Sequence, residues 1–268
     1  GVYICESIKE SELAIDEIFQ GKFGKAKNLL VEEFLKGEEM SYFIISDGKT
    51  IKKFDTAQDH KRVLEGDKGK NTGGMGAYSP SRLITEELDK KIMTKIIEPT
   101  IMGLNKAGIS YKGFLYAGLM IAPDGAIKVL EFNCRFGDPE TQPILLRLKS
   151  SLVELCLAAI ENNLTDYDIH WTDQHACGVV IASHGYPEEY TKNNEVSFQP
   201  SDIDGAKLFH AGTKLEGDKV LTTGGRVFCA TALGEDLHDA QIKAYNLVKS
   251  VSFDGAFYRK DIGNKGMK

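Results

Sequence analysis

Cysteine is scarce in this sequence and irregularly spaced. The five cysteines are Cys5, Cys134, Cys156, Cys177 and Cys229, and no two of them form a Cys-x-x-Cys pair. An odd number of cysteines without such spacing argues against a disulfide framework and against a zinc site. We therefore expect reduced thiols and a cytoplasmic protein.

Long apolar runs and an excess of basic residues are also missing. No run approaches the ~18 apolar residues of a membrane-spanning helix, and no secretory signal stands at the start. Lysine and arginine total 33 against 39 acidic residues, which gives a net charge of −6. This balance argues against a nucleic-acid binder that works by bulk phosphate attraction, but it leaves room for a local basic pocket that binds a small phosphorylated ligand. We expect neither a membrane nor a nucleic acid as a partner.

The chain does contain enough apolar sequence for substantial cores. Its 268 residues suffice for one large or two ordinary domains, and 42% of them are apolar. The composition turns polar around residues 163–173, where we place a domain boundary. The residues that follow predict a small α+β unit, in which a helix over 235–251 accompanies several short strands.

Apolar periodicity predicts a strand-rich first part. Strands are expected over the ranges 2–6, 29–34, 40–46, 113–121 and 127–132. Asp47-Gly48 is a hairpin signal after the third of them. A helix is expected over 85–106, interrupted at Pro99. The segment 56–80 is polar and rich in glycine, so its composition predicts a long loop.

The segment 129–142 begins as an apolar strand and ends as a polar loop. Side chains on a strand repeat their direction every two residues, so Glu131 and Asn133 project from the same face. A carboxylate and an amide oxygen suit a Mg²⁺ ion that also holds substrate phosphates. Arg135 continues the alternation and is able to clamp a phosphate or an acyl phosphate. The alternative for an isolated Glu-x-Asn is a solvated strand end.

Two further segments have the composition of a nucleotide site. In the stretch 29–39 the peptide groups of residues 33–35 are able to recognise an adenine edge, and Glu39 is able to reach the ribose. The alternative is an edge strand with exposed glutamates. In the stretch 71–78 three glycines allow backbone N–H groups to approach an anion, although no Gly-Lys-Ser/Thr follows as in a P-loop. The alternative there is a bare turn, and for the charged run 59–62 it is a solvated surface.

Six motifs stand in a characteristic order along the chain: QDHKR at 58–62, NTGGMGAYSP at 71–80, GFLYAGLM at 113–120, EFNCRFGDPETQ at 131–142, GGRV at 224–227 and YRKDIG at 258–263. Together they resemble one enzyme family, the phosphoribosylamine–glycine ligases, or glycinamide ribonucleotide synthetases, of the ATP-grasp superfamily. The resemblance covers essentially the whole chain.

This resemblance implies a fold and a reaction. The fold is α+β, an ATP-grasp fold with mixed or antiparallel sheets. It would divide into the rest of a lid subdomain and the adenine hinge (1–54), a catalytic core (55–165) and a small C-terminal α+β domain (166–268). The reaction joins glycine to 5-phosphoribosylamine with ATP, through an acyl phosphate of glycine, in de novo purine synthesis. The products are glycinamide ribonucleotide, ADP and phosphate.

The family pattern also implies roles for individual residues. Glu131 and Asn133 would hold Mg²⁺ (or Mn²⁺) on the ATP phosphates. Adenine would be bound by Glu32, Glu33, Phe34 and Leu35, and the ribose by Glu39. From chemistry we infer that Arg135 stabilises charge on the transferring phosphoryl group and that Asp59 binds the glycine amine. Further substrate contacts are expected from Asn71, Thr72, Gly73, Gly74, Met75, Gly76, Gly137, Asp138, Pro139, Glu140, Thr141 and Arg259.

One departure from the family pattern concerns the start of the chain. The family has an N-terminal domain and a glycine-rich loop with lysines that covers ATP, and residues 1–2 resemble the end of that loop. We expect this N-terminal part of the same enzyme to contribute to the phosphoribosylamine site. The alternatives are another ATP-grasp carboxylate ligase, against which the NTGGMG and RFGDPE segments argue, and a non-catalytic nucleotide-binding fragment.

Overall fold

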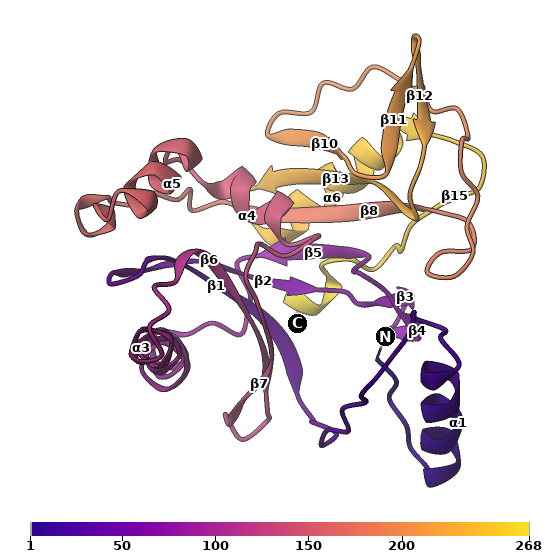
Figure 1. Ribbon diagram of the computed structural model, residues 1–268. Coiled ribbons are helices and arrows are strands. Elements are labelled where there is room, and N and C mark those ends of the chain that lie inside the picture. The colour runs from indigo at the N-terminus through magenta and orange to yellow at the C-terminus, as the bar shows by residue number, and fades with distance from the viewer. Residues whose placement is uncertain (1, 268) are drawn as a thin grey trace.

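One nine-stranded antiparallel sheet organises the computed structural model, which describes residues 2–267 (Figure 1). In spatial order its strands are β10 (Ala206–His210), β13 (Arg226–Gly234), β8 (His175–Ser183), β5 (Gly76–Ser79), β2 (Ile51–Asp59), β1 (Glu38–Asp47), β6 (Lys112–Ile121) and β7 (Ile127–Asn133), with β15 (Ala256–Phe257) beside β8. The α+β class with an antiparallel sheet is confirmed.

The sheet runs from the first part of the chain into the C-terminal part without a break. The joint is the pairing of β5 with β8, in which Gly76 lies opposite Val179 and Tyr78 opposite Cys177. The strands of the C-terminal part, orange in Figure 1, therefore continue the sheet begun by the violet strands. The division at residues 54/55 and 165/166 stays a prediction.

Helices begin where side-chain caps are available. Ser7, Thr85, Ser151 and Asp236 each accept a hydrogen bond from the backbone N–H three residues on. They start α1 (Ile8–Phe19), α2 (Glu86–Ile92), α5 (Leu152–Ile160) and α6 (Leu237–Val248). The interruption expected at Pro99 is present, because a π-helical segment (Met93–Ile97) separates α2 from α3 (Glu98–Lys106).

The remaining elements are short. They are β3 (Arg62–Leu64), β4 (Lys68–Asn71), α4 (Thr141–Arg147), β9 (Ser197–Phe198), β11 (Thr213–Glu216), β12 (Lys219–Thr222), β14 (Val251–Ser252) and the 3₁₀ turns Leu164–Asp166 and Asn264–Met267. The β3–β4 and β11–β12 pairs stand apart from the main sheet as two-stranded hairpins.

The prediction of two strands, over residues 2–6 and 29–34, is wrong. Residues 2–6 and 29–34 form no strand, because no neighbouring strand pairs with them among residues 2–267. Their apolar side chains are consequently left in solvent, and Val31 is 80% exposed. Apolar character alone predicts a strand, but a ladder of hydrogen bonds also needs a partner.

The loop expected over 56–80 is also wrong. This segment contains the end of β2, the β3–β4 hairpin and β5, which lies in the middle of the sheet. The glycine content that suggested a loop serves close packing instead. A β-carbon on Gly76 would lie 2.5 Å from the carbonyl oxygen of Gly178 on the neighbouring strand. Glycine in a central strand often marks such a close approach of backbones.

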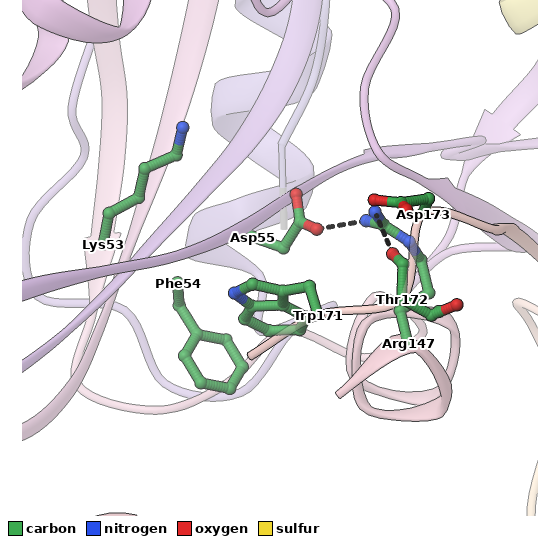
Figure 2. Close-up of a pocket in the computed structure, with 7 residues that line it drawn as sticks. All are labelled: Lys53, Phe54, Asp55, Arg147, Trp171, Thr172 and Asp173. Atoms are coloured by element: carbon green, nitrogen blue, oxygen red, sulfur yellow. Dashed lines mark hydrogen bonds and ion pairs between the residues drawn. The ribbon is translucent and has the colours of Figure 1, made fainter. Parts of the chain in front are cut away.

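A largely buried ion pair joins α4 to β2 (Figure 2). The Arg147 guanidinium at the end of α4 pairs with the Asp55 carboxylate of β2. It also donates to the carbonyl oxygen of Gln174 at 2.7 Å and to Ser79 Oγ at 3.0 Å. The Trp171 ring packs edge-on against Phe54, with ring centroids 4.7 Å apart. Because Arg147 has partners on several elements, we interpret its role beside this cavity as structural.

Candidate functional site

A polar cavity of about 180 Å³ lies where the ends of β2 and β7 meet two loops. The loops are 72–75, between β4 and β5, and 134–140, between β7 and α4. The lining residues are Asp59, Lys61, Thr72, Gly73, Tyr116, Glu131, Asn133, Arg135, Gly137, Asp138 and Glu140. The structure therefore brings together nine of the residues predicted from the sequence: Asp59, Thr72, Gly73, Glu131, Asn133, Arg135, Gly137, Asp138 and Glu140.

Glu131 and Asn133 lie at the end of β7 and both face this cavity. Glu131 pairs across the sheet with Gly118, and a register irregularity follows directly in the same pair of strands. A β-carbon on Gly118 would lie 3.4 Å from Cγ of Glu131 and 3.1 Å from the Tyr116 ring. The missing side chain at Gly118 therefore gives the Glu131 side chain its room above the sheet.

The cavity fits a divalent ion that is only partly held by protein. Among residues 2–267 no group of three or more His, Cys, Asp or Glu side chains is arranged to hold a metal. Glu131 and Asn133 offer two hard oxygen donors on one face, and the adjacent Arg135 is exposed. This donor set suits a Mg²⁺ ion that takes its other ligands from phosphates and water.

Asp59, the last residue of β2, carries an unsatisfied carboxylate oxygen. Its Oδ1 atom is buried and has no hydrogen-bond partner among residues 2–267. Burial, reinforced by the nearby Glu140 carboxylate, raises the pKa of Asp59 well above its ordinary value, while Lys61 acts in the opposite direction. A buried carboxylate oxygen without a partner attracts an ammonium group, so the geometry favours a ligand amine at this position.

Lys61 is a site residue that the sequence reasoning passed over. Its Nζ atom lies 3.2 Å from Oε2 of Glu39. Burial alone would lower the pKa of Lys61, but Tyr116, Glu39 and Asp59 outweigh it and raise the pKa, so the side chain stays charged. The signal was present in the sequence, because Asp59 and Lys61 are two residues apart and extended backbone turns both the same way.

Glu140 is buried at the back of the cavity. It is 4% exposed and accepts a 2.8 Å hydrogen bond from the hydroxyl of Ser41 on β1. Burial raises the pKa of Glu140 despite this hydrogen bond. Two neighbouring carboxylates with raised pKa values, Asp59 and Glu140, thus line the cavity, whereas Glu131 in the same lining is exposed.

The glycine-rich loop divides between the cavity and the core. Thr72 and Gly73 line the cavity, and Thr72 Oγ1 both donates to the carbonyl of Lys61 and accepts from Gly74 N, each at 2.9 Å. The other predicted residues of the loop lie elsewhere. Met75 is fully buried in the core under α6, Gly76 lies in β5, and Asn71 ends β4.

The loop that leads into α4 is similarly divided. Gly137 and Asp138 reach the cavity, and the side chain of Arg135 donates at 2.7 Å to the carbonyl oxygen of Phe136. Thr141 begins α4 and its N–H bonds the carbonyl of Gly137 at 3.2 Å. Pro139 is buried beside Gly74. Substrate contacts by Pro139 and Thr141 stay predictions.

The expected adenine hinge lies outside the cavity lining. Glu32, Glu33 and Phe34 are exposed on extended backbone, with Leu35 half-buried. Glu33 lies 3.8 Å from Lys128 on β7, so the hinge runs beside the strand that carries Glu131. Glu39 joins the cavity only through its ion pair with Lys61.

Arg259 lies in a separate buried network. It is 2% exposed, pairs with Asp67 at 3.1 Å and with Asp261 at 2.7 Å, and donates to the carbonyl of Arg62. These contacts tie the C-terminal tail to the β3–β4 hairpin. The N–H donors of the Arg259 guanidinium are engaged in these contacts. A phosphate contact by Arg259 stays a prediction.

Comparison with solved structures defines the class. The biotin carboxylase domain of 2-oxoglutarate carboxylase from Hydrogenobacter thermophilus matches with a TM-score of 0.67 at 12% identity, over 93% of this chain and 53% of that chain. At such low identity the likeness concerns the fold. Phosphoribosylamine–glycine ligase from Thermotoga maritima matches with a TM-score of 0.87 at 34% identity, over 98% of this chain and 65% of that chain. The fold is that of the ATP-grasp proteins, as expected from the sequence.

Sequence comparison gives the family. The phosphoribosylglycinamide synthetase ATP-grasp (A) domain matches residues 1–141, and the C domain of the same synthetase matches residues 176–265. The chain belongs to the phosphoribosylglycinamide synthetase family. It is 48% identical to the phosphoribosylamine–glycine ligase of Vibrio vulnificus (strain YJ016), over 100% of this chain and 63% of that protein. It is 50% identical to that of Salmonella typhimurium (strain LT2), over 98% of this chain and 62% of that protein.

This chain therefore spans about 63% of the length of the curated relatives it matches. Among residues 2–267, no helix has both the length and the apolar character needed to cross a membrane. Cys5, Cys134, Cys156, Cys177 and Cys229 are free thiols within residues 2–267.

Proposed function

We propose that this chain forms the ATP- and glycine-binding part of a ligase that joins glycine to 5-phosphoribosylamine, giving glycinamide ribonucleotide, ADP and phosphate. The observation that carries the proposal is the shared cavity of Asp59, Glu131, Asn133 and Arg135 in a chain of this family. Around this one small volume lie two hard oxygen donors, a guanidinium that would bind phosphate and a carboxylate that would bind an ammonium group. The proposal includes a cytoplasmic location.

The nucleotide is expected to lie along β7. The exposed peptide groups of residues 32–35 are available to the adenine edge, and Glu39 is available to the ribose once its pairing with Lys61 is exchanged for ligand contacts. Glu131 and Asn133 would hold Mg²⁺ (or Mn²⁺). When bound, such an ion neutralises phosphate charge and orients the terminal phosphoryl group.

The amino acid is expected at the inner end of the cavity. There the Asp59 carboxylate, which lines the cavity, would bind the glycine ammonium. This orientation directs the glycine carboxylate toward Arg135 and the phosphate end. A carboxylate oxygen attacks the terminal phosphorus of ATP, ADP leaves, and glycyl phosphate forms. The exposed guanidinium of Arg135 stabilises charge on the transferring group.

The second step makes the amide bond. The amine of phosphoribosylamine attacks the glycyl carbonyl carbon, the C–O bond to phosphate breaks, and the amine gives up a proton. We place phosphoribosylamine against Thr72, Gly73, Gly137 and Asp138, which line the cavity. We further propose that an N-terminal part of the same protein completes this substrate site.

The test is phosphate release from MgATP by the intact protein. We expect release only when glycine and phosphoribosylamine are both present, with glycinamide ribonucleotide as the product detected by mass spectrometry. Release with a different carboxylate, and none with glycine and phosphoribosylamine together, would overturn the proposal. Measuring the intact mass of the purified protein first establishes that the assay is run on the whole enzyme.

A further inference from the structure

The peptide groups of Gly73 are held by two side chains from the C-terminal part of the chain. Gly73 N–H donates to the hydroxyl of Tyr186 at 2.8 Å, and its carbonyl accepts from Nη1 of Arg226 at 2.7 Å. Tyr186 follows β8 and Arg226 begins β13. The loop on the cavity wall is therefore fixed by the segment that the family's C domain matches.

Arg226 also holds the second loop of the cavity. Its Nη1 atom donates to the carbonyl oxygen of Asp138 at 2.8 Å, and its Nη2 atom lies 3.2 Å from the Asp138 carboxylate. Gly73 and Asp138 both line the cavity. One guanidinium thus links two loops that line the cavity, and its planar set of donors suits several acceptors at once.

Arg226 and Tyr186 pack closely against backbone that has no side chain. A β-carbon on Gly73 would lie 2.9 Å from Cζ of Arg226 and 3.2 Å from the Tyr186 hydroxyl. A β-carbon on Gly225 would overlap the Tyr186 ring, so that ring packs directly on the backbone beside Arg226. Two glycines therefore let the two side chains and the loop approach one another.

We propose that Arg226 and Tyr186 are positioning residues that set the affinity for the amino-acid substrate. They hold Gly73 in place, and the next residue, Gly74, packs against the carboxylate of Asp59. If the loop moves, the wall that confines a ligand amine against Asp59 moves with it. This inference rests on the proposed function for its substrate, and it gives the C-terminal unit a role in the chemistry of the first part.

The kinetic test uses Arg226→Lys and Tyr186→Phe in the intact protein. Lysine keeps the charge next to Asp138 but cannot donate to both loops in fixed directions. We expect the KM for glycine to rise about tenfold, the effect of losing one charge-assisted hydrogen bond, while the KM for ATP changes by less than about twofold. The phenylalanine variant loses only the acceptor for Gly73 N–H, so a smaller rise in the same constant is expected.

Val227→Ala is the matched control. Val227 is adjacent to Arg226, fully buried in the C-terminal core, and contributes no side chain to the cavity. The Val227→Ala substitution should lower the melting temperature, because it makes a cavity beside the same strand. The KM for glycine should stay unchanged. Equal rises in the KM values for glycine and ATP in Arg226→Lys, or the same kinetic change in Val227→Ala, would overturn the positioning role.

Hydrogen exchange separates this inference from the proposed reaction. In the ligand-free protein, Tyr186→Phe should speed exchange of peptides that cover Gly73 by at least about threefold, with β8 unchanged. Unchanged exchange at Gly73 overturns the inference even if the ligase reaction is found. Faster exchange in a protein that does not use glycine supports the hold on the loop and overturns the assigned substrate.

Discussion

A β-carbon on Gly74 would lie 2.7 Å from Oδ1 of Asp59, so the loop backbone at Gly74 closes directly over this carboxylate. Gly74 also has a φ of 114°, which disfavours any side chain there. The contact buries an oxygen that has no hydrogen-bond partner in the part of the chain that the structure describes. Burying a charged group in this way destabilises the fold, and such a feature is expected where a ligand supplies the missing partner.

Asp59→Asn should therefore separate stability from binding. The pKa of Asp59 is raised, so its ionised form is disfavoured in the folded state, and stability falls as the pH rises from the ordinary value of 3.8 through the folded value. Asparagine cannot ionise, and we expect the ligand-free variant to melt about 2 °C or more higher at neutral pH. Its kcat/KM for glycine should fall about 100-fold, because a buried ion pair is lost. A lower melting temperature with unchanged glycine kinetics would contradict this account.

The same residue predicts a pH dependence for glycine binding. Since only ionised Asp59 pairs with an ammonium, the KM for glycine should rise as the pH falls through the raised pKa. Lys61 lowers that pKa, so Lys61→Met should shift the rise toward higher pH. Initial rates at saturating MgATP across the neutral range measure both profiles. Superimposable profiles for Lys61→Met and the unmodified protein would remove Lys61 from this role.

Glu131→Gln tests the metal pair. The amide keeps the shape of the side chain but removes its charge, so Mg²⁺-dependent turnover should fall by orders of magnitude while the fold persists. Exposed Glu216 on the β11–β12 hairpin provides the control, because Glu216→Gln makes the same chemical change away from the cavity. Circular dichroism checks the fold of both. Unchanged kinetics in Glu131→Gln would remove this residue from the metal site.

His60 predicts an acid-sensitive stability. It is fully buried between Asp59 and Lys61, and its Nε2 accepts from Gly263 N–H at 3.3 Å. Burial, with help from Lys265 and Arg259, lowers its pKa from 6.5 to about 4. The unfolded chain therefore takes up a proton first, and stability should fall by about 3 kcal/mol as the pH drops from 6.5 toward 4. Urea unfolding across this range should show a weaker dependence in His60→Gln.

The Arg147–Asp55 pair of Figure 2 predicts a large effect on stability. Arg147→Met leaves the Asp55 carboxylate buried without its cation, and unfolding free energy should fall by about 3–5 kcal/mol. Adding Asp55→Asn removes the uncompensated charge and should restore part of the loss. If denaturant unfolding shows no recovery in the double variant, the loss comes from packing rather than from charge.

Local sequence was sufficient to predict that Glu131 and Asn133 face the same way, but not which residues surround them. The two-residue spacing of Glu131 and Asn133 on an apolar strand predicted their common direction, because strand geometry is local. The place of Lys61 in the cavity was not predicted. Its side chain points the same way as Asp59 only if residues 59–61 are extended, whereas the composition of 56–80 suggested a loop. That loop was wrong since its glycines allow close strand packing, and this depends on partners far along the chain.

The hydrogen bond between Arg226 and Gly73 cannot be predicted from local sequence. These residues are 153 positions apart and meet only because β8 joins β5 in the sheet. The family resemblance identified the GGRV motif at 224–227 but did not predict that its Arg226 contacts Gly73. The expected strands at 2–6 and 29–34 failed for a similar reason, because a strand depends on a neighbour that sequence periodicity does not reveal.

Activation of glycine through its carboxylate is the central chemical claim. The most direct measurement is turnover by the intact protein with glycine labelled with ¹⁸O in both carboxylate oxygens, together with MgATP and phosphoribosylamine. If glycyl phosphate forms, one labelled oxygen leaves with the phosphate, and mass spectrometry should find one ¹⁸O in each phosphate released. Phosphate without the label, alongside formation of glycinamide ribonucleotide, would contradict the account.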